Sequence, residues 1–414
     1  MKKKEIYIPI ELKPREFISQ VYLAGELAKI GGRVFIGSKV IINDLIKEKK
    51  NNQGVFFYKG GGGSYKKFKK ISTKVKAIAV LDQELSPVMI EDDHIKFRFT
   101  EGSVKYVSRH YYISKEMKEK AIKYIKDIDP NTTRDVGWPR VDLWQTSKHY
   151  ISNESVKKIH NKYGNDFILF SSDFAHNSKQ LLDERNLRLE LLGAKKTKDE
   201  LESFRQLQKR KYEYFLKFID YLHQVENDNN ISQIIIRPHP AEDHEVWKNK
   251  LNNFKKIKLA YDGEITPWLL ASKGLLHRGC TTAIQAFISG IKIGFLSNFA
   301  DENNKSIVSQ VSTKLNTHEE FSKWTNSNLI EPSFETNKNI LKKHINFPIN
   351  GATKDIAKDM MTLTGNPVIQ STITEKFILN KIITKLFFIL KSKKSKKNQP
   401  DKLGNLGEYN KMLD

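Results

Sequence analysis

Short apolar strands alternate with amphipathic helices twice along this chain, and this alternation limits its fold more than any other feature. In the first set, the strand IYIPIE is followed by the helix REFISQVYLAGELAKIGG and the strand RVFIGS. The second set begins at DFILFSS and continues through QIIIRPHP, GLLHRG and IKIGFL. Strands that are separated by helices pair in parallel, with helices on both faces of the sheet. The pattern therefore predicts an α/β protein with two similar Rossmann-like domains.

A polar, charged segment near residues 143–165 separates the two sets. We predict an N-terminal domain over residues 1–150, a C-terminal domain over 151–370 and a basic amphipathic tail over 371–414. With 414 residues, of which 39% are hydrophobic, the chain is long enough to bury two cores of ordinary size.

The formal net charge of +23 predicts an anionic partner. Nucleic acid, an anionic bilayer surface and phosphorylated substrates all fit a field of this size, although much of the lysine could equally be solvated surface. The single cysteine, Cys280, excludes an internal disulfide framework and a multi-cysteine metal cluster. The apolar start is too short for a signal peptide, and no apolar run reaches the length of a membrane span. We therefore expect a cytoplasmic protein.

Ligands of open α/β sheets bind at the carboxyl ends of the strands, so the residues after each strand are the first site candidates. Arg237 and His239 follow the strand at 233–236 in the block RPHP, where two prolines fix the backbone. A guanidinium and an imidazole held in this way could face a phosphate or a base edge. The alternative for His239 is a structural role.

The block HRGCTTAIQAFISG, residues 277–290, resembles a seat for a phosphate. Gly279 would allow close backbone approach, while Thr281 and Thr282 would begin a helix with their hydroxyl and N–H groups pointing outward. Plain helix capping is the alternative. Gln285 could reach a sugar hydroxyl, and Cys280 is expected to be a packed small residue rather than a nucleophile.

Two further candidates leave their alternatives open. Glu264 lies in a turn before a predicted helix, where it could accept hydrogen bonds from a ligand or cap the helix. Arg140, in DVGWPRVDLW, lies in the crossing between the two halves, where an internal ion pair is as plausible as a ligand contact.

The N-terminal half offers acids at a strand end. In VLDQELSP, Asp82 and Glu84 alternate in extended chain and so point to the same side. One of them could act as a general base or nucleophile while the other tunes it. Lys59 precedes four glycines that we interpret as a loop lining the site, because the block lacks the Gly-Lys-Ser/Thr of a nucleotide triphosphatase.

Several of these blocks, in their order, resemble the bacterial "surface carbohydrate biosynthesis protein" family. The matching blocks are Arg15-Glu16 with LAGELAKIGG, then VLDQE, GWPRVDLW and HRGCTTAIQAF, over roughly residues 5–297. The resemblance implies the GT-B arrangement, in which two Rossmann-like domains face each other across a cleft, and a role in building surface polysaccharide. It makes Arg15, Glu16 and Arg140 candidates for lining the cleft or contacting an acceptor, and Lys59, beside the glycine loop, is a further possible contact there.

More distantly, RPHP followed by a hydroxyl pair is similar to bacterial sialyltransferases and β-Kdo transferases. That resemblance implies a CMP-activated acidic sugar, a nonulosonate or Kdo, as donor, with no separate cofactor and no metal. It implies that His239 contacts the cytidine phosphate or ribose and that Thr281 and Thr282 contact the phosphate. Asp82 or Glu84 would supply the catalytic carboxylate. The chain departs from the surface carbohydrate family at DQEL, where that family has Asp-Glu-Glu-Gly, and at Gln285, where it has Glu.

The tail contains FILNKIITKLFFIL followed by KSKKSKK. An apolar helix that ends in a cationic cluster predicts attachment to an anionic membrane surface, here the inner face of the plasma membrane, which would bring a lipid-linked glycan acceptor within reach. The alternative is a helix that packs on the fold and carries a disordered basic end.

Two other functions remain open at this stage. A polyol-phosphate transferase of the CDP-glycerol type shows similar Gly-x-Pro-Arg and His-Pro blocks. A nucleic-acid-binding protein would explain the charge through phosphate contacts. The sequence contains no recognised nucleic-acid module, so we expect no nucleic-acid partner.

Overall fold

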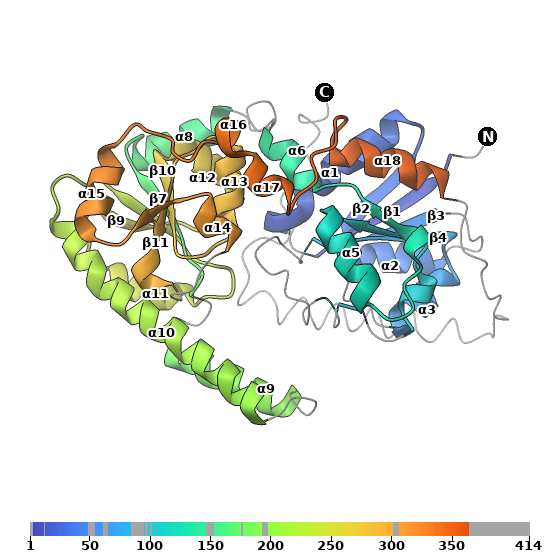
Figure 1. Ribbon diagram of the computed structural model, residues 1–414, viewed down its shortest axis with the longest axis horizontal. Helices are drawn as coiled ribbons and strands as arrows, with labels where there is room; N and C mark the ends of the chain where they lie inside the picture. Colours follow the sequence, from blue (N-terminus) through green and yellow to red (C-terminus); the bar gives the residue numbers. More distant parts are fainter. Residues whose placement is uncertain are drawn as a thin grey trace. The chain divides into compact units, whose positions relative to one another are not determined.

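The chain folds into two compact units (Figure 1). The computed structural model describes residues 3–11, 13–48, 54–60, 65–83, 95, 98–99, 102–145, 153–174, 177–192, 198–300 and 306–363. Unit 1 contains the described residues up to Asp142 and the C-terminal segment from His344, whereas unit 2 contains Leu143–Lys343. The predicted site residue Glu84 and the predicted tail at 371–414 lie outside the described residues.

Unit 1 is built on a parallel sheet in the order β2-β1-β3-β4-β5-β6. All residues of β3 and β4 are buried, as expected for strands covered on both faces. The strands are β1 (Glu5–Ile10), β2 (Arg33–Ser38), β3 (Gly54–Tyr58), β4 (Ala77–Leu81), β5 (Arg109–Tyr112) and β6 (Thr133–Asp135). The helices are α1 (Lys13–Lys29), α2 (Lys39–Glu48), α3 (Tyr65–Ser72), α5 (Lys115–Tyr124), α6 (Pro139–Gln145), within which the boundary to unit 2 falls, and α18 (Ala352–Thr362).

Helix α18 returns to unit 1 at the end of the described chain and packs on α1. The carboxylate of Asp142 accepts hydrogen bonds from the N–H groups of Ala352 (3.1 Å) and Thr353 (2.7 Å) at its first turn. The ammonium of Lys4 donates to carbonyls of the last turn, including that of Leu363 at 2.8 Å. The carboxylate lies at the positive, N-terminal end of the helix dipole and the ammonium lies at the negative, C-terminal end, so both charges stabilise the helix. The C-terminal domain predicted over 151–370 therefore differs from the observed unit 2, which ends at Lys343.

Unit 2 is built on a second parallel sheet, in the order β12-β11-β10-β7-β8-β9. Its strands are β7 (Ile168–Ser171), β8 (Ile234–Arg237), β9 (Ile257–Leu259), β10 (Gly274–His277), β11 (Ile293–Leu296) and β12 (Thr313–Leu315). Its helices are α8 (Asn153–Tyr163), α9 (Lys179–Leu192), α10 (Lys198–Asn227), α11 (His244–Leu251), α12 (Thr266–Ala271), α13 (Thr282–Ile288), α14 (Ile307–Gln310), α15 (His318–Asn326), α16 (Phe334–Asn337) and α17 (Asn339–Lys342). The predicted α/β class with two parallel sheets is confirmed.

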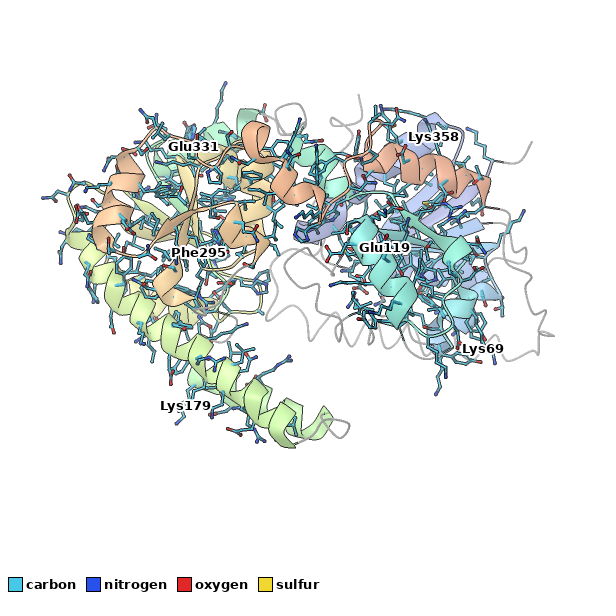
Figure 2. The ribbon with its side chains drawn as sticks, viewed as in Figure 1. Lys69, Glu119, Lys179, Phe295, Glu331 and Lys358 are labelled. Carbon is cyan, nitrogen blue, oxygen red and sulfur yellow. The ribbon has the colours of Figure 1, made fainter. Side chains whose placement is uncertain are left out.

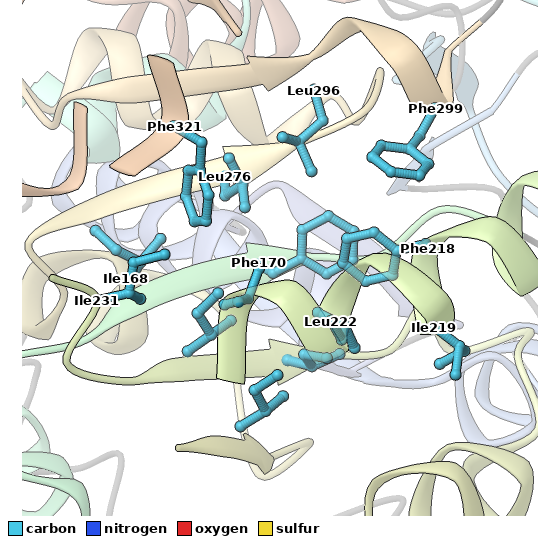
Figure 3. Close-up of a cluster of buried hydrophobic side chains, with 14 of the residues drawn as sticks. Ile168, Phe170, Phe218, Ile219, Leu222, Ile231, Leu276, Leu296, Phe299 and Phe321 are labelled. Atoms are coloured by element: carbon cyan, nitrogen blue, oxygen red, sulfur yellow. The ribbon is translucent and has the colours of Figure 1, made fainter. Parts of the chain in front are cut away.

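The core of unit 2 forms where α10 crosses its sheet (Figure 3). Phe218 of α10 stacks on Phe170 of β7 with ring centroids 4.4 Å apart, and Phe299 packs edge-on against Phe218. Charged side chains such as Lys69 and Lys179 project outward, whereas Phe295 of β11 is buried within the unit (Figure 2). None of the helices in the described ranges is long and apolar enough to cross a membrane.

Each sheet has one point at which the strand order reverses. In unit 1, β2 lies on one side of β1 and β3 lies on the other. In unit 2, β8 lies on one side of β7 and β10 on the other. The loops at the carboxyl ends of such a strand pair diverge and leave a crevice, which is where open α/β sheets bind ligands. The fold therefore directs attention to residues after β1 and β3 in unit 1, and after β7 and β10 in unit 2.

Candidate functional site

Three adjacent strands of unit 2 end at the same level. Ser171 of β7 pairs in register with Arg237 of β8, and Leu276 of β10 pairs with Phe170. The loop after β10 turns at Gly279, whose φ of 147° is rarely adopted by other residues. This turn leads directly into α13, beside the end of β7.

Hydroxyl groups gather at this point. The Oγ1 atom of Thr282 lies 3.4 Å from the Oγ of Ser171 and 3.1 Å from the Sγ of Cys280. Thr281 is exposed and its side chain makes no capping hydrogen bond. The structure thus brings Thr281 and Thr282 to the switch point of unit 2, together with Ser171, which sequence reasoning missed.

The amides at the start of α13 are less available than the sequence suggests. The N–H of Ala283 donates to the Cys280 carbonyl (3.1 Å), and the N–H of Thr282 lies 3.5 Å from the Cys280 Sγ. The groups offered to a ligand here are therefore mainly the hydroxyls. Burial, with a contribution from the charge of Asp173, raises the pKa of the Cys280 thiol, which fits its predicted role as a packed residue.

Arg237 makes contacts within unit 2. Its guanidinium donates to the carbonyls of Asp262 (2.9 Å) and Gly263 (3.0 Å) and lies 5.1 Å from the ring centroid of Trp268. Burial lowers the pKa of Arg237 to about 10, against the opposing effect of Asp262. These contacts fasten the turn after β9 to the end of β8, and a phosphate contact of Arg237 stays a prediction.

His239 lies in a loop that one buried carboxylate holds. Its Nδ1 atom accepts a hydrogen bond from the N–H of Ala241 (3.1 Å), and its own N–H donates to Glu242 Oε2 (3.3 Å). Glu242 also accepts from the Ser172 hydroxyl at 2.8 and 2.7 Å and from the Trp247 indole N–H at 2.8 Å. Glu242 thereby joins the loop after β8 to the end of β7. Sequence reasoning missed it, although an acid three residues after a strand-end histidine is a visible signal.

Gln285 does not point where the sequence predicts. It is only 5% exposed, and its Nε2 donates to the Thr266 hydroxyl at 2.7 Å. The Thr266 hydroxyl in turn donates to the carboxylate of Glu264, which is half-buried. The predicted contact of Gln285 with a sugar hydroxyl is therefore replaced by a relay that orients Glu264.

Arg278 braces the loops around this site. Its Nε donates to the Phe299 carbonyl at 2.5 Å, and its Nη1 pairs with Asp173 at 3.1 Å. The guanidinium also lies 4.8 Å from the centroid of the Phe174 ring. Because these contacts join the loops after β7, β10 and β11, they hold this end of the sheet in a fixed arrangement.

A second group of candidates gathers at the switch point of unit 1. The ammonium of Lys59, directly after β3, lies 3.0 Å from Glu16 Oε1 and 3.3 Å from Glu11 Oε2. Glu11 follows β1 and also pairs with Lys39, the first residue of α2. Burial alone would raise the pKa of Glu11, but the hydrogen bond from Lys39 and the charge of Lys59 lower it overall. The backbone of Arg15 lies in α1, but its side chain is outside the description.

Asp82 and Arg140 have partners inside unit 1. The buried carboxylate of Asp82 accepts hydrogen bonds from Arg98 Nε and Nη2, both at 2.6 Å. Arg140 lies 5.8 Å from the ring centroid of Trp138. The catalytic role of Asp82 or Glu84 stays a prediction. Among the residues described, no group of three or more His, Cys, Asp or Glu is placed to hold a metal ion.

No family model and no curated protein matches this sequence. Among solved structures, UDP-GlcNAc 2-epimerase from Methanocaldococcus jannaschii is similar, with a TM-score of 0.53 and 13% identity over 87% of this chain and 99% of that one. The same enzyme in complex with UDP-GlcNAc and UDP gives a TM-score of 0.50 and 14% identity, over 87% and 99% of the two chains. The wall teichoic acid polymerase TagF, as a variant soaked with CDPG, gives a TM-score of 0.50 and 9% identity over 86% and 88%. At these identities the likeness concerns the fold, and this chain has the two-unit α/β fold of the GT-B type.

Proposed function

We propose that this protein is a nucleotide-sugar-dependent glycosyltransferase of bacterial surface polysaccharide biosynthesis, whose unit 2 binds the nucleotide. The observation that carries the proposal is the hydroxyl cluster of Ser171, Thr281 and Thr282 at the switch point of unit 2, with the loop of His239 after the neighbouring strand. Structures of the same fold hold UDP-GlcNAc and UDP in one case and were soaked with CDPG in another, which supports a nucleotide-bearing ligand.

The proposed chemistry needs two things from the protein. The departing nucleotide phosphate must be stabilised, and a base must remove a proton from the acceptor hydroxyl. The hydroxyls of Thr281 and Thr282 and the imidazole of His239 can donate hydrogen bonds to the phosphate. For the base we propose Glu84 ahead of Asp82, because both oxygens of Asp82 accept hydrogen bonds from Arg98. In this proposal cationic and hydroxyl groups take the charge of the leaving group, with no metal.

The finer assignment follows the sequence resemblance. The proposed donor is a CMP-activated nonulosonate or Kdo, and the acceptor is a glycan or a lipid-linked glycan. The tail at 371–414 would hold the enzyme on the cytoplasmic face of the plasma membrane.

One alternative has an observation in its favour. A polyol-phosphate transferase of the CDP-glycerol type would also bind a cytidine nucleotide, but it would release CMP and transfer a phosphate with the polyol. The fold likeness to the TagF structure soaked with CDPG supports this alternative.

A thermal-shift screen against CMP, CDP, UDP and GDP tests the nucleotide site. A ligand at a hundred times its dissociation constant stabilises the folded state by about 2.7 kcal/mol. We expect the cytidine nucleotides to raise the melting temperature. Stabilisation by UDP alone would overturn the cytidine assignment, and no response to any nucleotide would overturn the proposed function. Product analysis with CMP-sugar and CDP-glycerol donors then separates the two transferases.

Two variants locate the site. Thr282→Val removes the hydroxyl at the start of α13. Thr313→Val is the matched control, since its hydroxyl donates to the Glu331 carbonyl at the edge strand β12. His239→Asn keeps a side-chain acceptor for the turn but removes the imidazole. We expect Thr282→Val and His239→Asn to weaken nucleotide binding and Thr313→Val to leave it unchanged. Equal losses in Thr282→Val and Thr313→Val would place the nucleotide elsewhere.

A further inference from the structure

The edge of the unit 1 sheet at β2 differs from the other sheet edges. β2 pairs with β1, and within the described ranges no strand lies on its other side. An edge strand presents unpaired N–H and C=O groups, which proteins protect by keeping the strand short or by placing charges on it. The edge strands β6, β9 and β12 follow this rule, because each has three residues, and they carry Arg134 with Asp135, Lys258 and Lys314.

β2 has neither protection. It is six residues long, RVFIGS, and its one charged residue, Arg33, stands at its first position. The Arg33 N–H donates to the Lys4 carbonyl, just before β1, at 2.8 Å, so the backbone groups of Arg33 and of every second residue after it face β1. The backbone groups of Val34 and Ile36 therefore point to the open side. The residues of β2 after Arg33 are only half-buried.

Exposed apolar side chains flank both ends of β2. Ile30, three residues before the strand, is 43% exposed, and Ile41, three residues after it, is 55% exposed. Val40 beside it is 44% exposed. Ile41 lies next to the strand itself, since its Cγ2 is 3.9 Å from the position that a Cβ at Gly37 would take. Single exposed apolar residues are ordinary, but a group of them around an unpaired edge is typical of an interaction surface.

The arrangement is complementary to a second copy of itself. An antiparallel copy of β2 would place the start of one strand beside the end of the other, and a twofold axis makes this contact twice. Ile30 of each copy would then lie beside Ile41 of the other. Arg33 would lie opposite the neutral Ser38, so the pairing brings no like charges face to face.

The charges around this edge do not call for a charged partner. Arg33 Nη1 lies 3.9 Å from Glu5 Oε1 on β1, and Lys39, at the start of α2, pairs with Glu11. Each cation near the ends of β2 thus has an acid within its own unit. An apolar, neutral strand edge fits a second copy better than it fits an acidic or basic peptide.

We propose that this protein forms a twofold-symmetric dimer in which the β2 strands of two copies pair antiparallel and join the two unit 1 sheets. The outward backbone groups of Val34 and Ile36 gain partners in this dimer, and Ile30, Val40 and Ile41 are withdrawn from water. The proposal does not rest on the proposed function, because β2 pairing requires no ligand in either unit.

Sedimentation velocity of the full chain over a dilution series tests the proposal. We expect the wild-type protein to sediment as a dimer that dissociates on dilution. Ile41→Lys should weaken the dimer about tenfold or more, because it puts a charge into an apolar contact twice in each dimer. Leu329→Lys is the matched control: it introduces the same charge at a 72% exposed position of unit 2 and should leave dimerisation unchanged.

A second variant tests the antiparallel direction. Ile30→Glu combined with Ile41→Lys places opposite charges beside each other across the twofold axis, so the double variant should dimerise more tightly than Ile41→Lys alone. Hydrogen exchange needs no variant. The amides of Val34 and Ile36 should exchange slowly in concentrated wild-type protein and faster on dilution, as the strands separate.

Four outcomes would overturn the proposal. The wild-type protein could sediment as a monomer at every concentration, or as a dimer that Ile41→Lys leaves intact. Equal weakening by Leu329→Lys would show general repulsion between charged chains. Slow exchange of Val34 and Ile36 in the monomer would show that another segment of the same chain covers the edge. All four are independent of the nucleotide screen, so the dimer and the proposed function can fail separately.

Discussion

Replacing Glu242 with alanine tests whether one buried carboxylate holds the loop of His239. Among the described residues, Glu242 accepts hydrogen bonds from the Ser172 hydroxyl, the Trp247 indole N–H and the His239 N–H. Ser172 is 1% exposed and Trp247 is 0% exposed, so neither can turn to water when the carboxylate is removed. The His239 N–H lies in a half-buried loop and can recover a water partner.

The cost follows from these donors. A buried polar group that loses its partner costs about 1–3 kcal/mol, so Ser172 and Trp247 together predict about 2–6 kcal/mol of lost stability in Glu242→Ala. Glu242→Gln keeps an oxygen for the Trp247 N–H, and its amide can donate to the Ser172 hydroxyl. Only the charge-assisted part is then lost, so we expect about 1 kcal/mol.

Urea unfolding at 25 °C measures both variants. Glu245→Ala is the control, because Glu245 lies three residues further along the chain, in α11, and its side chain is 73% exposed; this variant should change the free energy of unfolding by less than about 0.5 kcal/mol. The reasoning is refuted if Glu242→Ala unfolds like the control, or if Glu242→Gln costs as much as Glu242→Ala. Glu242→Ala should also weaken nucleotide binding at the proposed site, since the His239 N–H loses its hydrogen bond to Glu242.

Three other predictions test single contacts. Asp82→Ala leaves the Arg98 guanidinium without the Asp82 carboxylate and should lower the free energy of unfolding in urea by about 3–5 kcal/mol. Adding Arg98→Met to this variant should restore part of the lost stability. Normal stability with lost turnover would instead support a catalytic Asp82. Lys292→Met removes three hydrogen bonds, at 2.7, 3.0 and 2.6 Å, to carbonyls at the end of α15, and should lower the free energy of unfolding by about 2 kcal/mol or more. Because the pKa of Lys67 is lowered from 10.5 to about 8, the unfolded chain holds this proton to higher pH than the folded one. The contribution of Lys67 to stability therefore rises between pH 8 and 10.5, and Lys67→Met should flatten the pH dependence of unfolding in that window.

The two parallel sheets could be predicted because their signal is local. Each strand is a short apolar run and each crossover a helix, so a reader of the sequence needs no distant contact to infer them. The division into units could not be predicted in the same way. Helix α18 belongs to unit 1 because Asp142 and Lys4 bind its two ends, and these partners lie more than 200 residues away in sequence.

The candidate site could be predicted for those residues that directly follow a strand, because open α/β sheets bind ligands at the carboxyl ends of their strands. That rule found Thr281, Thr282, His239 and Lys59, all of which lie at carboxyl ends of the sheets. It could not tell which way a side chain turns once it is there. Gln285 is one turn into α13, yet it rotates inward to Thr266, because the buried face of a short helix is decided by packing rather than by spacing.

Net charge proves a weaker guide to ligands than position. The +23 of the sequence suggests an anionic partner, but many lysines have their charge satisfied within the fold. Lys4 and Lys292 bind carbonyls at helix ends, and Lys59 is matched by two carboxylates. The total charge therefore counts many groups whose partners lie within the fold, and it does not locate an anionic ligand.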